Sequence, residues 1–409
     1  MKEKQGPGLG QDKIIDSSEE AGRTRERNIT VNYEQDLNMT PKVIIVVQQE
    51  TLRERPRIFK LSKLLKASDI PFEIWKFGER QDEQFPYISV CNLISTRWRQ
   101  RPAVLRYVVW MAAVFFGAWR YRRKASFFAV GFDSAFPIAM LPMRKPTLIF
   151  DNIDNISLSY RWPYGFHSVF RALEIWISQR AQIHVVPSRS RWSRTDANLR
   201  IVTNTPSRQA LLEAKAIADQ RGYRRGSDLT IYVNGWLPRT RGIRTLLRAL
   251  DAARQKRLPV RVLVAGRPSC EDAGRLLSME CTENLGLLTN AEALATYYRS
   301  HIAFIYYDPS HAINVLAESQ KWTDCWATDT PFVTNVEVKT LDPYLRHDAC
   351  FALPYEDSDG LAALLETLVH DRSPLEKVRI NLRKMNFKYW DDEMKQVIGE
   401  WLELNRAMP

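Results

Sequence analysis

Short apolar runs recur along the chain, and each is followed by glycine or polar residues. Such runs are typical of strands that are covered on both faces, as in parallel α/β sheets. A first series of predicted strands lies at 43–47, 72–77, 127–130, 147–150 and 183–186. A second series, which begins after a charged stretch, lies at 229–233, 260–266, 302–307 and 331–334.

Helical spacing connects the predicted strands. Ile58, Leu61 and Leu65 share one face of a helix predicted over 57–67, and a similar pattern follows Gly242. Strands and helices therefore alternate through both series. The fold class that this predicts is α/β, with two tandem doubly wound, Rossmann-like domains.

The two series divide the chain into segments. The polar, aperiodic residues 1–40 are expected to form a disordered leader. We expect a first domain over 41–215, a second over 216–375 and a helical, amphipathic tail over 376–409. The boundary between the two domains is expected within 204–228.

The bulk composition agrees with two globular domains. The chain has 409 residues, more than the ~100–200 of one ordinary domain, with 45% hydrophobic and 26% charged residues. Its five cysteines are dispersed without a CxxC pair, and the N-terminus is polar and charged, unlike a signal peptide. We therefore expect a cytoplasmic protein.

Positive charge is concentrated in one segment. The net charge is +12, and eight basic residues with no acid lie between Arg97 and Lys124. Within that segment, residues 107–119 carry no charge, but this run is shorter than the ~20 residues of a membrane span. The pattern favours a helix at an anionic membrane surface over a nucleic-acid-binding face, with a buried core helix as the alternative.

Several familiar catalytic motifs are missing from the sequence. It contains no Walker A loop, HExxH or GxSxG, and its six histidines are isolated, so a metal-dependent hydrolase loses support. What remains are polar residues at the carboxyl ends of predicted strands, where open α/β sheets bind ligands. Asp133 and Asp151 follow two such strands, and helix capping is the alternative role for both.

Three elements of the second series carry a family resemblance. They are a glycine loop with basic residues, an apolar strand that ends in glycine, and a Lys followed by an acid before a strand-opening Pro. In this chain they are Gly235–Gly242 with Arg239 and Arg241, Leu263–Gly266, and Lys321 with Asp324 before Pro331. Through them, residues 42–375 resemble GT-B glycosyltransferases, especially the retaining family-four group.

The resemblance implies a site for a nucleotide-sugar donor in the second domain. Lys321, in the first turn of a helix, would meet the diphosphate, and Asp324 would accept the ribose hydroxyls. Arg239 or Arg241 would stabilise the leaving group without a metal. The alternative is that Lys321 and Asp324 form a solvated pair on a helix surface. The other residues predicted to bind the donor are Gly235, Gly266, Glu318 and Ser319.

The resemblance further implies that the first domain binds the acceptor. A Pro-Arg pair before its first helix is matched by Arg57, with Arg55 before the Pro, and these two residues and Asp151 are the predicted acceptor-binding residues. The predicted catalytic residues are Asp133, Arg241 and Lys321.

The expected function is therefore transfer of a sugar from a nucleotide-diphosphate sugar, with a UDP-sugar guessed, to a lipid-linked or polysaccharide acceptor. The resemblance implies retention of configuration, no cofactor and a peripheral position on the cytoplasmic face of the membrane. Because Asp324 stands where relatives usually have Glu, a catalytically inactive binding or scaffold protein stays open. A GT-B-fold sugar-nucleotide epimerase or a phosphorylase also stays open.

Overall fold

The computed structural model describes residues 42–48, 56–78, 89–142, 147–160, 162–163 and 165–406. The expected leader 1–40 and the candidate acceptor residue Arg55 lie outside the described residues.

The first sheet is parallel and has the strand order β3-β2-β1-β4-β5-β6-β7. Its strands are β1 (Lys42–Val47), β2 (Phe72–Phe77), β3 (Ser89–Ile94), β4 (Ala125–Val130), β5 (Leu148–Asp151), β6 (Ile183–Val186) and β7 (Leu199–Ile201). Ile45 in the central strand β1 pairs with Ile74 on one side and with Phe128 on the other. The apolar runs thus meet in register across the middle of the sheet.

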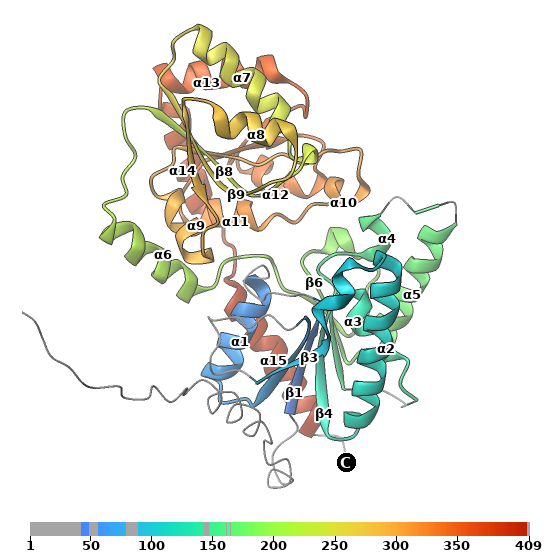
Figure 1. Cartoon of the computed structure of the whole chain (residues 1–409). Coiled ribbons are helices and arrows are strands. Elements are labelled where there is room, and N and C mark those ends of the chain that lie inside the picture. The colour runs from blue at the N-terminus through green and yellow to red at the C-terminus, as the bar shows by residue number, and fades with distance from the viewer. Residues whose placement is uncertain are drawn as a thin grey trace, which may run out of the picture. The chain divides into compact units, whose positions relative to one another are not determined.

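Helices cover both faces of the first sheet (Figure 1). Val43, Ile45 and Val47 pack with α1 (Pro56–Ala67) and α15 (Trp390–Arg406). Ile44 and Val46 point to the opposite face, because side chains alternate along a strand. There they pack with α2 (Ala103–Tyr121), α3 (Phe132–Ala139) and α5 (Phe166–Arg180).

The second sheet is parallel as well and has the strand order β10-β9-β8-β11-β12-β13. Its strands are β8 (Leu229–Leu237), β9 (Val260–Pro268), β10 (Thr282–Gly286), β11 (Ile302–Phe304), β12 (Phe332–Asn335) and β13 (Phe351–Leu353). On one face lie α7 (Ile243–Gln255), α8 (Glu271–Ser278) and α13 (Ser358–His370). On the other lie α9 (Asn290–Tyr297), α11 (Gln320–Ala327), α12 (Asp342–Arg346) and α14 (Ser373–Lys384).

Shorter segments and one further helix complete the description. They are α4 (Ile156–Ser159), α6 (Arg208–Gln220), α10 (Ala312–Val315), η2 (Thr96–Gln100), η3 (Arg189–Arg191), η4 (Arg239–Arg241) and η5 (Lys339–Leu341). The α/β class with two doubly wound sheets is confirmed.

The helix α15, part of the expected tail, belongs to the core of the first sheet. Trp390, Met394 and Trp401 are fully buried there, against α1 and the first sheet. The Glu393 carboxylate accepts hydrogen bonds from the backbone N–H and the hydroxyl of Thr203, both at 2.7 Å. The chain therefore leaves the first sheet after β7, builds the second sheet and returns.

The apolar, arginine-flanked segment forms α2, which is longer than its uncharged stretch. By length and composition alone this helix is apolar enough to cross a membrane. However, Trp110, Val114 and Ala118 are buried against the first sheet. Because one face of α2 is part of a protein core, we regard it as a surface helix and not as a span.

Trp401 offers a test of the contribution of α15 to the first domain. Replacing Trp401 by Ala leaves a cavity in the core and removes the hydrogen bond from the indole N–H to Gln182 at 3.0 Å. The expected loss in the free energy of unfolding is ~3–5 kcal/mol. Urea denaturation measures it, with Leu404→Ala on the exposed side of the same helix as the control. Equal losses for both variants would contradict the placement of α15.

Candidate functional site

The carboxyl ends of β8 and β9 are held close together by two glycines. Gly235 and Gly266 pair in register and have φ values of 95° and 131°, which favour glycine. A Cβ on Gly266 would lie 1.9 Å from the carbonyl oxygen of Gly235, so a side chain does not fit there. Gly242 has φ 66°, and a Cβ there would lie 2.8 Å from Cβ of Tyr306. These glycines fix the course of the loop from 235 to 242.

Lys321 lies over this glycine loop. A Cβ on Gly235 would be 3.3 Å from both Cε and Nζ of Lys321. The prediction that Gly235 and Lys321 belong to one site thus agrees with their position. Burial lowers the pKa of Lys321 to about 7, with Arg241 lowering it further and Asp324 opposing the shift.

Arg241 is the second cation at this place. Its guanidinium lies 4.3 Å from the centre of the Tyr307 ring, and its Nε and Nη1 have no hydrogen-bond partner among the described residues. Lys321 likewise makes no ion pair with a described residue. Two neighbouring cations that make no ion pair with a described acid form a place where an anion would be stabilised.

Asp324 lies in the same helix as Lys321 and is buried. Its Oδ1 has no hydrogen-bond partner among the described residues. Burial raises the pKa of the Asp324 carboxyl to about 7, while Lys60, Gln320 and Lys321 act to lower it. Lys60 lies on α1 of the first domain, so a buried charge of that domain stabilises the ionised form of Asp324. Sequence reasoning missed Lys60.

The other predicted donor residues lie around this cluster. Ser319 precedes α11 and has a buried hydroxyl with no partner among the described residues. Arg239 is exposed on η4, and its carbonyl accepts the hydroxyl of Tyr355 at 3.4 Å. Glu318 accepts a hydrogen bond from Ser190 at 3.2 Å, and burial raises the pKa of its carboxyl. Its carboxylate thus contacts the loop after β6.

Arg57 and Asp151, both predicted to bind the acceptor, face each other. Nε and Nη2 of Arg57 donate to the two carboxylate oxygens of Asp151 at 2.7 and 2.9 Å, and both side chains are buried. Asp133 lies in the first turn of α3, after the positive-φ residue Gly131. All three therefore lie at the carboxyl edge of the first sheet, and their roles toward an acceptor stay predictions.

Asn204 connects the Arg57–Asp151 pair to the predicted donor cluster, which is formed by Lys321, Arg241 and Asp324. Its Oδ1 accepts from Nη1 of Arg57 at 3.0 Å, and its Nδ2 donates to the carbonyl of Glu318 at 3.0 Å. Its own carbonyl accepts the hydroxyl of Thr323 at 2.7 Å. A single linker residue thus holds both ends of the segment that carries Lys321. Sequence reasoning placed Asn204 only at a domain boundary.

Arg191, at the end of η3, is a second contact that sequence reasoning missed. Its Nε donates to the carbonyl of Leu316 at 2.9 Å, and its Nη1 donates to the carbonyl of Ile153. It therefore fixes the backbone just before Glu318 against the loop after β5. Nothing local in the sequence around Arg191 indicates this, because both partners are distant in the chain.

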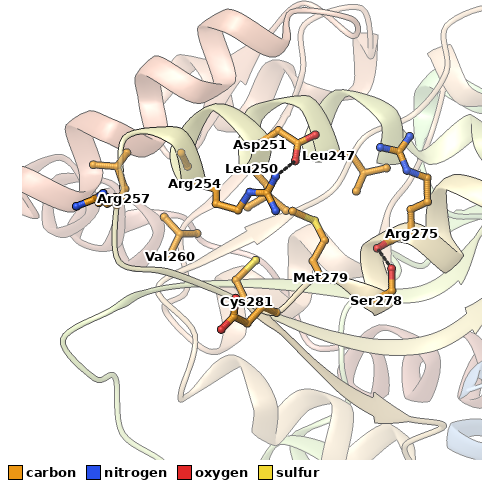
Figure 2. Close-up of a pocket in the computed structure, with 13 residues that line it drawn as sticks. Leu247, Leu250, Asp251, Arg254, Arg257, Val260, Arg275, Ser278, Met279 and Cys281 are labelled. Carbon is orange, nitrogen blue, oxygen red and sulfur yellow. Dashed lines mark hydrogen bonds and ion pairs between the residues drawn. The ribbon is translucent and has the colours of Figure 1, made fainter.

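A cavity of about 770 Å³ lies away from this cluster, between α7, α8 and the start of β9 (Figure 2). Arg254 and Arg275 are among its lining residues, and Arg254 lies 3.9 Å from the carboxylate of Asp251. Val260, the first residue of β9, also lines it, which places the cavity at the amino edge of the second sheet. None of the predicted site residues borders it.

Across the described part of the chain, no group of three or more His, Cys, Asp or Glu side chains is arranged to hold a metal ion. Metal independence stays a prediction.

Solved structures with the same architecture are numerous. Sucrose-phosphate synthase from Thermosynechococcus elongatus matches with a TM-score of 0.64 at 13% identity, over 90% of this chain and 100% of that one. Anabaena HepE in complex with UDP-glucose matches with a TM-score of 0.59 at 12% identity, over 90% and 100%. The chain has the GT-B fold.

A third similar structure is described with a different activity. A Listeria monocytogenes protein described as a UDP-N-acetylglucosamine 2-epimerase matches with a TM-score of 0.59 at 9% identity, over 91% of this chain and 98% of that one. No family model and no curated protein matches the sequence. At these identities the GT-B likeness establishes the fold, and the chemistry has to be argued from the site.

Asn204 allows a test of how the donor segment is positioned. Asn204→Ala removes the acceptor for Arg57 and the donor to Glu318, so nucleotide affinity is expected to fall about tenfold, since each such hydrogen bond contributes ~1 kcal/mol. Asn198→Ala is the matched control, because its side chain donates to the carbonyls of Ser178 and Ala181 inside the first domain and not to the segment that carries Lys321. Calorimetric titration with UDP measures the affinity, and equal effects of both variants would refute the positioning role.

Proposed function

We propose that the chain transfers a glycosyl group from a nucleotide-diphosphate sugar to a hydroxyl acceptor. The observation that carries this proposal is the pair of adjacent cations, Lys321 and Arg241, which make no ion pair with a described residue and lie beside the exposed backbone of Gly235. A diphosphate supplies the missing negative charge, and the glycine allows it to approach the main chain. That one structure with this fold contains UDP-glucose supports the choice of ligand.

The remaining polar groups suit the rest of a nucleotide. Asp324, with one carboxylate oxygen free of partners among the described residues, is proposed to accept the ribose hydroxyls. Gly266 has no side chain and so leaves room at the end of β9. Arg239, Glu318 and Ser319 surround the cluster. A UDP-sugar is the donor that we propose.

The chemistry follows from where charge develops. The bond between the anomeric carbon and the β-phosphate oxygen breaks, and a new bond forms between that carbon and the acceptor oxygen. Lys321 and Arg241 stabilise the negative charge on the departing nucleoside diphosphate, which takes up the proton of the acceptor hydroxyl. We propose retention of configuration and metal independence, on the family resemblance. Asp133, at the carboxyl edge of the first sheet, is proposed to act on the acceptor.

We propose a lipid-linked or polysaccharide acceptor at the cytoplasmic face of a membrane. The support is α2, whose exposed side carries Val104, Val108 and Phe116 and whose ends carry arginines. The five cysteines are all free, which fits a reducing compartment. In this proposal Arg57 and Asp151 lie on the acceptor side and act by holding Asn204 in position. Arg55 contacts the acceptor.

A sugar-nucleotide epimerase is the second candidate, because a structure with the same fold is described as one. The two functions differ in their need for an acceptor. A UDP-sugar incubated with the protein alone yields a changed sugar if the chain is an epimerase. Release of UDP that depends on an added glycan or lipid acceptor indicates a transferase. Proton NMR separates these results, because an epimer differs from its parent sugar in coupling constants and not in mass.

The Lys321 side chain provides a direct test of the donor site. Lys321→Met is expected to weaken UDP-glucose binding about tenfold to a hundredfold, since charge-assisted hydrogen bonds contribute ~1.5–3 kcal/mol. The variant should nevertheless be no less stable than the wild type, because a buried cation beside Arg241 is removed. Calorimetry and urea denaturation measure the two quantities, with the exposed Lys339→Met as the control. Unchanged affinity would place the donor elsewhere.

The dependence of UDP-glucose affinity on pH gives an independent test. The carboxyl of Asp324, with its pKa raised to about 7, is protonated below that pH and must ionise to bind ribose in the proposed way. The ammonium of Lys321, with its pKa lowered to about 7, loses its proton above that pH. Affinity is therefore expected to be highest near pH 7 and to fall on both sides. In Lys321→Met the decline on the alkaline side should disappear, and a flat wild-type profile would count against both assignments.

A further inference from the structure

Large apolar side chains are exposed on α5 as well as on α2. On α5 they are Phe166, Val169 and Trp176, with exposed Ala172 between them. Their spacing places them on one stripe along the helix. Phe166 is 53% exposed, which is unusual for a phenylalanine in a soluble domain.

The arginines of α5 contact other protein groups, and Arg180 also lies 5.5 Å from the centre of the Trp176 ring at the end of the stripe. Arg171 lies over the Trp192 ring at 4.2 Å and pairs with the buried Glu174. Arg180 donates to the carbonyls of Ala139 and Leu141 at 2.6 and 3.0 Å. Both arginines thus contact groups of the protein, and the exposed stripe residues Phe166, Val169, Ala172 and Trp176 are themselves uncharged.

The stripes of α2 and α5 belong to one layer of helices. Both helices pack on the same face of the first sheet, with the short α3 in contact with each. Both also begin at the carboxyl edge of that sheet, because each follows a strand and leads back to the next. Near that edge the hydroxyls of Tyr107 on α2 and Tyr160, just after α4, lie 3.3 Å apart. The layer therefore presents two parallel apolar stripes.

Basic side chains mark both ends of the α2 stripe. Arg97 and Arg101 are exposed before the helix, and Arg123 and Lys124 are exposed after it. We infer that α2 and α5 together dock on an anionic phospholipid bilayer, with both apolar stripes in the interface and the basic ends on the headgroups. This inference adds a membrane contact to the proposed function. Its relevance to the acceptor rests on that proposed function.

Charge favours a bilayer over a second copy of this chain as the occupant. In a symmetric dimer through this layer, the ends of one α2 would face those of its partner. Since both ends are basic and residues 97–124 contain no acid, every such pairing brings like charges together. Anionic headgroups have the opposite sign and cover both ends at once.

Vesicle flotation tests the role of α5. The full chain should float with vesicles of equal parts phosphatidylcholine and phosphatidylglycerol, and less with phosphatidylcholine alone. The double variant Phe166→Ser with Val169→Ser should lower vesicle affinity at least about tenfold, because two inserted side chains are lost. Leu212→Ser on α6 is the matched control, since Leu212 is 69% exposed outside the layer.

Two results would overturn the inference. One is flotation of the double variant equal to that of the wild type. The other is a wild-type dimer, seen by light scattering, that the double variant dissociates. Titration of the same samples with UDP-glucose separates this inference from the proposed function: the double variant should retain wild-type nucleotide affinity. A wild type that floats without binding UDP-glucose would contradict the proposed function alone.

Discussion

The buried ion pair of Arg57 and Asp151 organises the centre of this molecule. A charged pair removed from water is stable only when its remaining donors are satisfied, and Arg57 satisfies them with Asn204. Because Asn204 in turn holds Glu318 and Thr323, the position of the donor segment depends on a contact inside the first domain. Removing either partner would leave a buried charge, and removing Arg57 would also take away a hydrogen bond that holds Asn204.

The predicted donor cluster contains two cations, Lys321 and Arg241, that make no ion pair with any acid in the described part of the chain. Lys321 and Arg241 are brought together by the glycine loop, although Arg241 disfavours the charged form of Lys321. Such an arrangement stabilises the folded protein less than a paired one would. It is expected where a binding site has been retained for a ligand of opposite charge.

The sequence predicted the central strands well and missed the strands at the sheet edges. β3, β7, β10 and β13 are the four that were not predicted, and each is an edge strand. Edge strands are covered on fewer sides, so residues such as Asn92 in β3 or Glu283 in β10 interrupt the apolar run. Gly235, Gly266 and Lys321 could be grouped from local motifs. Asn204, Lys60 and Arg191 could not, because their partners are distant in sequence and only the tertiary fold brings them together.

The return of α15 to the first sheet has a consequence for synthesis of the chain. Domains usually fold in the order in which they leave the ribosome. Here one face of the first sheet needs Trp390, Met394 and Trp401 to complete its core. The second domain can therefore complete its core before the first domain does. Until then, the first domain exposes an apolar face for most of translation. Cells that make this protein would have to protect that face, by a chaperone or by early contact with another surface.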